Sequence, residues 1–190
     1  WVVTPREGRA VEINALWYNA LCRAAALAGM LGEPAGEYAA PADRARAAFQ
    51  AFWYADGRYL YDRIDDAGRP DPSLRPNQLF AVSLPHSPLS PEQAEGVVAA
   101  VERSLLVPLG VRTLAPEDPA YRGQYLGGRR ERDAAYHQGT AWPWLLGPFA
   151  AAYLRVHGHR ATARERLREL LVPLAAHMRE FGLGQVAEVV

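Results

Sequence analysis

The stretch AYHQGTAWPW, residues 135–144, places a histidine, a glutamine, a threonine and two tryptophans around one glycine. An ordinary connection between helices is rich in Gly, Ser and Asp, and an ordinary helix start needs only a capping residue. Thr140 can cap a helix that begins near residue 142, because Pro143 then falls in its first turn. Gly139 would let a ligand approach the backbone closely. The stretch therefore predicts a break between helices that presents imidazole, amide and indole groups outward.

Hydrophobic periodicity predicts six helices along the chain. The predicted segments are about 11–32, about 41–55, a short one within 75–84, one starting at Ser90–Pro91, about 142–158, and one starting near Thr162 and closed by Gly182. Pro41 and Gly57 mark the expected ends of the second segment. Gln93 and Glu165 follow Ser90 and Thr162 at the spacing of a capping box.

Strand patterns are weak outside one segment. Residues 58–64, RYLYDRI, could pair locally around a turn near Asp66–Gly68. No repeat of fixed period is present, although pairs of helices recur in the manner of an α/α arrangement. The sequence therefore predicts an all-α fold with long, patterned connections.

Composition excludes several classes of partner and site. The 190 residues carry a formal net charge of zero, so neither nucleic acid nor an anionic membrane surface is expected as a partner. No apolar run approaches the roughly 20 residues that span a bilayer. The single Cys22 rules out a disulfide framework and fits a reducing, cytoplasmic location. The aspartates of 62–71 lack the spacing of a calcium loop, so we expect neither a metal nor a cofactor.

The first polar stretch of interest is TPREGRAVEINALWYNAL, residues 4–21. In a helix, Asn19 and Arg23 each fall within about 20° of Glu12, because seven residues nearly close two turns and eleven nearly close three. Trp17 lies on the opposite side. The alternative is a plain helix with Glu12 in its favourable first turn.

Three further stretches have the same mixture of polar and aromatic groups. Arg75, Asn77 and Gln78 flank Pro76 before an apolar helix, where the alternative is that Asn77 only caps that helix. His137 alone would more often be structural, but its neighbours favour a ligand site. Glu188 lies among small and apolar residues, where a carboxylate is costly unless it is paired or used, although an exposed terminal glutamate is the alternative. Sugars need this mixture, because their hydroxyls bind planar polar groups and their C–H faces stack on aromatic rings.

Four motifs in order resemble the C-terminal amylo-α-1,6-glucosidase domain of bacterial and archaeal glycogen debranching enzymes. They are TPREGRAVEINALWYNAL (4–21), LYDRIDDAGRPDPSLRPNQLFAVSLP (60–85), AYHQGTAWPWLLGPF (135–149) and GLGQVAEVV (182–190). The resemblance implies an (α/α)6 barrel, a six-hairpin toroid, that hydrolyses the α-1,6-linked glucose at a glycogen branch with inversion. Six helices against twelve imply that residues 1–190 form about half of one glycosidase domain, as a fragment truncated at both ends and inactive alone.

The resemblance also implies roles for individual residues. Glu188 matches the general base, whereas the general acid, an aspartate in a Trp-x-Asp motif, precedes the Thr-Pro-Arg stretch and lies outside this chain. The residues that the resemblance places around the sugar are Glu12, Trp17, Arg75, Asn77, Gln78, His137, Gln138, Thr140, Trp142 and Trp144. The implied partner is glycogen or a branched α-glucan oligosaccharide.

Two other functions remain open at this point. One is another (α/α)6 α-glucosidase, trehalase-like or glucoamylase-like, and the other is a non-catalytic helical module that binds sugar. A half-barrel would also expose apolar helix faces, from which we expect self-association.

Overall fold

The computed structural model describes residues 4–180 and 184–190. Two predicted features lie outside the described residues. They are Gly182, which was predicted to close the last helix, and the beginning of the GLGQVAEVV motif that contains Glu188. Across the rest of the chain the structure is mostly helical, as predicted.

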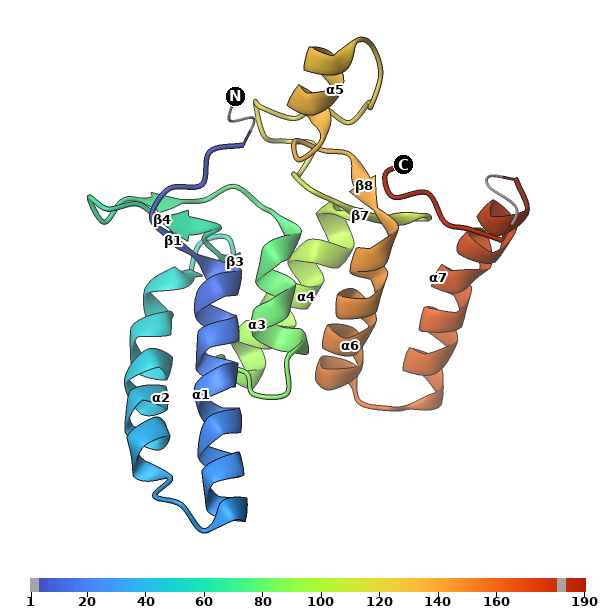
Figure 1. Ribbon diagram of the computed structural model, residues 1–190. Helices are drawn as coiled ribbons and strands as arrows, with labels where there is room; N and C mark the ends of the chain where they lie inside the picture. Colours follow the sequence, from blue (N-terminus) through green and yellow to red (C-terminus); the bar gives the residue numbers. More distant parts are fainter. Residues whose placement is uncertain (1–3, 181–183) are drawn as a thin grey trace.

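Three helix hairpins organise the described part of the chain (Figure 1). In the first, α1 (Val11–Leu31) packs against α2 (Gly36–Phe49); in the second, α3 (Leu79–Ser83) packs against α4 (Pro91–Ser104); in the third, α6 (Leu146–His157) packs against α7 (Ala161–Glu180). The first helices of the three hairpins are also neighbours, since α3 contacts both α1 and α6. The helix pairs thus stand side by side, as an α/α arrangement requires.

Three small antiparallel sheets among the described residues correct the all-α prediction. The first joins β1 (Arg9–Ala10), β4 (Arg63–Ile64) and β5 (Pro70–Asp71); the second joins β2 (Trp53–Tyr54) and β3 (Tyr59–Leu60); the third joins β6 (Leu106–Val107), β7 (Gly110–Arg112) and β8 (Ala141–Trp142). The predicted local pairing is confirmed for β4 and β5, which meet around a turn in which Gly68 N–H donates to the Asp65 carbonyl at 3.0 Å.

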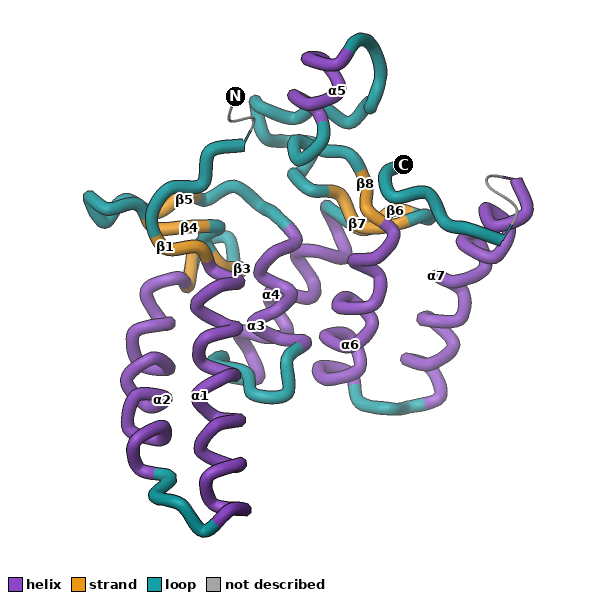
Figure 2. Tube along the Cα trace, viewed as in Figure 1, coloured by secondary structure: helices purple, strands orange, loops and turns teal. Residues whose placement is uncertain are grey.

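The sheets and long connections gather at one end of the helices (Figures 1 and 2). The short turns that close the three hairpins lie at the opposite end. Segments that are far apart in sequence therefore meet at the sheet end: β1 pairs with β4, and β7 pairs with β8. This end brings three of the four sequence motifs together.

The core lies between α3, α4 and α6, with contributions from α1 and the sheets. Its largest fully buried side chains include Phe149, Leu60, Leu79, Leu105, Leu114, Val97, Val98 and Val101. The valines of α4 follow the spacing that predicted this helix from sequence. Burying each large apolar side chain contributes about 1.5–3 kcal/mol to the stability of the fold. This cluster therefore stabilises the helices that carry the sheet end.

Helix ends follow the predicted chemistry in some places and not in others. The Ser90–Gln93 capping box of α4 is confirmed in both directions. Helix α2 begins five residues before Pro41, which lies inside it and removes only one helical hydrogen bond. Helix α7 begins at Ala161, and the Arg160 carbonyl accepts its first helical bond from Arg164. The predicted Thr162 cap is therefore wrong.

One helix was not predicted at all. Helix α5 (Arg129–Ala135) rises from the long connection between β7 and β8. Its sequence, RRERDAA, is almost entirely polar and lacks the apolar stripe on which the other predictions rested. Ala135 alone is buried in it, and Arg129 lies 3.8 Å from Asp133 one turn later.

Candidate functional site

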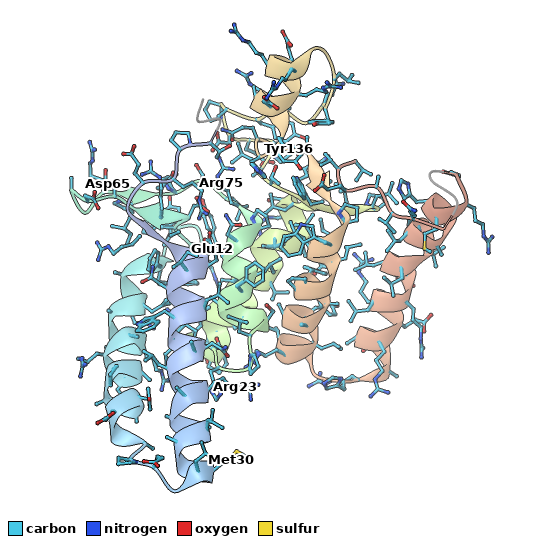
Figure 3. The ribbon with its side chains drawn as sticks, viewed as in Figure 1. Glu12, Arg23, Met30, Asp65, Arg75 and Tyr136 are labelled. Carbon is cyan, nitrogen blue, oxygen red and sulfur yellow. The ribbon has the colours of Figure 1, made fainter. Side chains whose placement is uncertain are left out.

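The sheet end contains a hollow of about 250 Å³ that we call the arginine hollow. Its lining residues are Thr4, Arg6, Arg75, Pro76, Asn77, Thr113 and His137. Three of the four sequence motifs contribute to it: 4–21, 60–85 and 135–149. Figure 3 shows Glu12, Arg75 and Tyr136 at this end of the molecule, far from Met30 at the opposite end.

Arg6 stands between two carboxylates at the floor of the hollow. Its guanidinium donates to both oxygens of Glu12, at 2.5 and 2.8 Å, and to both oxygens of Asp62, at 2.7 and 3.0 Å. Burial alone would lower the pKa of Arg6, but Glu12 and Asp62 raise it above the usual range. Glu12 is thus connected to the hollow through Arg6 rather than lining it. Sequence reasoning missed Arg6 as a site residue, although it belongs to the quoted TPREGR motif.

Asp62 is the buried centre of the network, with 2% of its surface exposed. Besides Arg6, its carboxylate accepts a hydrogen bond from the Asn77 amide at 3.1 Å and lies 3.8 Å from the Arg75 guanidinium. Burial raises the pKa of Asp62, while Arg6, Asn77 and Arg75 each oppose this effect. Because one carboxylate binds all three donors, Asp62 fixes their positions relative to one another. It too was missed, since four aspartates between 62 and 71 looked alike in sequence.

Arg75 ties the second motif to the third. It donates to the His137 carbonyl at 2.7 Å, to the Thr113 carbonyl at 3.1 Å and to the Gln138 side-chain oxygen at 2.8 Å. Burial lowers the pKa of Arg75, and the Asp62 and Asp71 carboxylates oppose this effect. The predicted grouping of Arg75, His137 and Gln138 is therefore real in the geometry, although Gln138 acts by holding Arg75.

His137 lies at the rim of the arginine hollow. Partial burial, together with the positive charges of Arg75 and Arg6, lowers its pKa below the ordinary value of 6.5. Its ring stacks on Trp142, with centroids 5.3 Å apart and an interplanar angle of 18°. The Trp142 indole N–H donates to the Tyr136 carbonyl at 3.1 Å. Trp142 therefore supports the imidazole from behind, and the neutral imidazole faces the hollow.

Trp17 lies apart from this group. It is 59% exposed and lines a separate hollow of about 450 Å³ between α1 and α2, together with Arg9, Asn14 and Arg44. Trp144 is 56% exposed, and its ring packs beside Phe80, with centroids 6.2 Å apart. Neither tryptophan lines the arginine hollow.

The side chains of Gln78 and Thr140 bond to backbone groups, and Gly139 makes room for a neighbouring side chain. The buried Gln78 amide donates to the Arg75 carbonyl at 2.9 Å and accepts from the Leu60 N–H at 3.0 Å. The Thr140 hydroxyl donates back to the Tyr136 carbonyl at 2.8 Å, so it does not cap the following helix as predicted. Gly139 has φ 139°, and a Cβ there would lie 2.5 Å from the Tyr121 ring. A protein side chain, rather than a ligand, occupies the space that Gly139 leaves.

Glu188 lines a neighbouring space that we call the glutamate hollow, of about 270 Å³. Its lining residues are Tyr125, Asp133, Tyr136, Glu188 and Val189. Glu188 is exposed, and burial together with the neighbouring Glu188 carboxylate raises the pKa of the Tyr136 hydroxyl. Tyr136 lines the glutamate hollow and His137 lines the arginine hollow, and their rings lie 4.7 Å apart.

Within residues 4–180 and 184–190, no group of three or more His, Cys, Asp or Glu side chains is placed to hold a metal ion. In the same ranges, no helix combines the length and apolarity that a membrane span requires.

Comparison with known sequences identifies the family. The model of the family described as amylo-alpha-1,6-glucosidase matches residues 1–190. The glycogen debranching enzyme of Saccharomyces cerevisiae is 35% identical over 108 residues, which cover 53% of this chain and 7% of the yeast enzyme. The chain thus spans a small part of that curated relative.

Comparison with solved structures shows the fold. The GH63 mannosylglycerate hydrolase of Thermus thermophilus, in complex with glucose, superposes with a TM-score of 0.66 at 20% identity, over 95% of this chain and 41% of that one. The same hydrolase with Tris gives a TM-score of 0.65 and 39% coverage of its own chain. These enzymes have a six-hairpin glycosidase fold. The three helix hairpins, the hollow built from three motifs and the match over the whole sequence agree: this chain belongs to the amylo-alpha-1,6-glucosidase family of glycoside hydrolases.

Proposed function

We propose that the protein carrying this chain is an amylo-α-1,6-glucosidase that releases the α-1,6-linked glucose at branch points of glycogen with inversion. The arginine hollow is the observation that carries this proposal. Its volume of about 250 Å³ lies just below the range of about 300–1,000 Å³ typical of small-molecule sites, which suits a single sugar unit. The yeast relative supports a branched α-glucan as the partner.

The groups around the hollow suit a neutral, hydroxyl-rich ligand. Arg6, Arg75 and Asn77 supply N–H donors in planar groups, and Glu12 and Asp62 hold the two guanidinium groups in place. The ring of Pro76 offers an apolar wall, and the neutral imidazole of His137 offers one donor and one acceptor. Sugars need such alternating polar and apolar contacts.

We assign the general base to Glu188. In the inverting reaction, the carboxylate takes a proton from a water molecule while the water oxygen bonds to the anomeric carbon. The bond from that carbon to O6 of the main chain breaks, and a carboxylic acid outside this chain protonates O6. The glutamate hollow, of about 270 Å³, leaves room for the water beside Glu188.

We further propose that the whole domain is an (α/α)6 barrel of which this chain forms about half. Three hairpins that stand side by side support this, as does the coverage of 39–41% of the solved relatives. We place this enzyme in the cytoplasm, where it would act on stored glucan.

The test is Glu188→Gln in the protein that carries this chain, assayed on a branched limit dextrin. Loss of a positioned base typically costs 10²–10⁴-fold, so we expect kcat for glucose release to fall by about that factor. Glu180→Gln, at the exposed end of α7, is the matched control and should leave the rate unchanged. Near-normal glucose release by Glu188→Gln would exclude Glu188 as the base.

Substrate comparison separates the proposed activity from the related ones. We expect hydrolysis of α-1,6-linked substrates to exceed that of α-1,4- and α,α-1,1-linked substrates. Preference for either of the latter would indicate a glucoamylase-like or trehalase-like enzyme. Glucan binding that needs Arg75, with no turnover on any substrate, would indicate a non-catalytic sugar-binding module.

A further inference from the structure

The backbone around Glu188 is anchored on both sides. Before it, the Ala187 N–H donates to the His177 imidazole of α7 at 3.2 Å. After it, Val190 exchanges two backbone hydrogen bonds with Ala141 of β8, each 3.0 Å long. The position of the Glu188 main chain is therefore set, and only its side-chain torsions remain to be fixed.

Tyr136 is the group that faces the Glu188 carboxylate inside the glutamate hollow. The two residues line the hollow together, and the carboxylate interacts electrostatically with the tyrosine hydroxyl. Tyr136 belongs to the third sequence motif but not to the set of residues proposed to bind the sugar. Partial burial and the bond to Glu188 both raise the pKa of Tyr136, so its hydroxyl keeps its proton and stays a donor.

Tyr136 is itself held from several directions. Its ring meets Trp142 edge to face, with centroids 4.8 Å apart, and packs beside His137 and Tyr125 at 4.7 and 5.7 Å. Its carbonyl accepts hydrogen bonds from the Thr140 hydroxyl and the Trp142 indole. A side chain fixed in this way can impose one orientation on a flexible partner.

We propose that Tyr136 is a positioning residue that orients the Glu188 carboxylate for the removal of a proton from water. This inference rests on the proposed function, in which Glu188 is the base. A hydroxyl that donates to a carboxylate forms a stronger hydrogen bond than one between neutral groups, so it can hold the carboxylate in one orientation. It also occupies one side of the carboxylate and leaves other lone pairs for the water.

The experiment is Tyr136→Phe in the protein that carries this chain, which removes the hydroxyl and keeps the ring packing. A hydrogen bond to a charged group corresponds to a loss of about 10- to 100-fold, which we expect in kcat with KM changed by less than about twofold. The split between kcat and KM is the readout, because a misoriented base slows the chemical step and leaves sugar binding unchanged. A merely structural role for Tyr136 would not separate kcat from KM in this way.

Three further proteins complete the design. Tyr153→Phe, on α6 with its ring beside Phe149 and His157, is the matched control and should behave as the parent. Tyr136→His, which restores a ring donor, should recover part of the kcat that Tyr136→Phe loses; it also serves if the phenylalanine variant does not fold. If Glu188→Gln abolishes turnover while both Tyr136 variants keep the parental kcat, the role of Tyr136 is overturned and the proposed function stands. If Glu188→Gln is active, the proposed base and the role of Tyr136 are both overturned.

Discussion

Charge balance around the arginine hollow bears on what it can bind. Two guanidinium groups, those of Arg6 and Arg75, face two carboxylates, those of Glu12 and Asp62. The four charges cancel, and the His137 imidazole beside them is kept neutral. An anionic ligand would find little net attraction there, whereas a neutral polyol would find fixed donors and acceptors. At the scale of single residues, this charge balance supports the proposal of an uncharged sugar as the ligand.

The lowered pKa of His137 predicts a pH-dependent stability. As pH falls, the unfolded chain takes up a proton at His137 first, near the ordinary pKa of 6.5. The contribution of the neutral imidazole to the free energy of unfolding is therefore complete above that pH, and it is lost as pH falls through the lowered pKa of the folded state. His137→Asn should therefore make the urea midpoint less sensitive to pH between about 7.5 and about 5.5 than it is in the parent. At pH 7.5 neither the parent nor the variant is charged at position 137, so a difference in urea midpoint at that pH reports packing alone. An equally steep pH dependence in the variant would contradict the assignment.

The site residues show how far sequence could go. Arg75, Asn77 and His137 were predicted as site residues. The structure brings them together because their motifs lie at the same end of the helices. Gln78 and Thr140 have the same chemistry, but their nearest partners are backbone groups. Which partner a polar side chain finds depends on the packing of distant segments, so residue type alone could not separate the two kinds.

At the scale of elements, the capping box of α4 offers a clean test of local stability. The Ser90 hydroxyl accepts from the Gln93 N–H at 3.2 Å, and the Gln93 side chain accepts from the Ser90 N–H at 3.0 Å. Ser90→Ala should lower the free energy of unfolding by about 1 kcal/mol, within the usual range of 0.5–2 kcal/mol, as measured by urea denaturation. Ser104→Ala, at the far end of the same helix, should be neutral or slightly stabilising. Equal effects of the two substitutions would argue against the cap.

Elements were predictable where their own residues determine them. The longer helices were found because each carries apolar residues at helical spacing, although the ends of α2 and α7 were not predicted correctly. Most strands are only two residues long, and some form because a distant segment pairs with them, as β1 does with β4. Helix α5 has no apolar face to detect. Sequence patterns of period 3.6 or 2 carry no information about such short, context-dependent pieces.

At the scale of the whole molecule, one face of α1 is apolar and uncovered. Its exposed residues include Ile13 (59%), Leu16 (43%), Trp17 (59%), Leu27 (55%), Met30 (84%) and Leu31 (69%). A surface of this kind favours association. We expect residues 1–190 prepared alone to show a mass in light scattering that falls on dilution, and Leu16→Glu with Trp17→Glu to shift the chain towards monomer. Ala40→Glu, on exposed α2, is the control. A monomer at all concentrations would refute this expectation.

The contacts that shape the arginine hollow join residues far apart along the chain. Arg6 reaches Asp62 across 56 positions, and Arg75 reaches His137 across 62. Hairpins that close through neighbouring residues form fast, whereas such distant junctions depend on all three hairpins having docked. We therefore expect the arginine hollow to form last on folding and to open first under mild denaturation, while the helices persist.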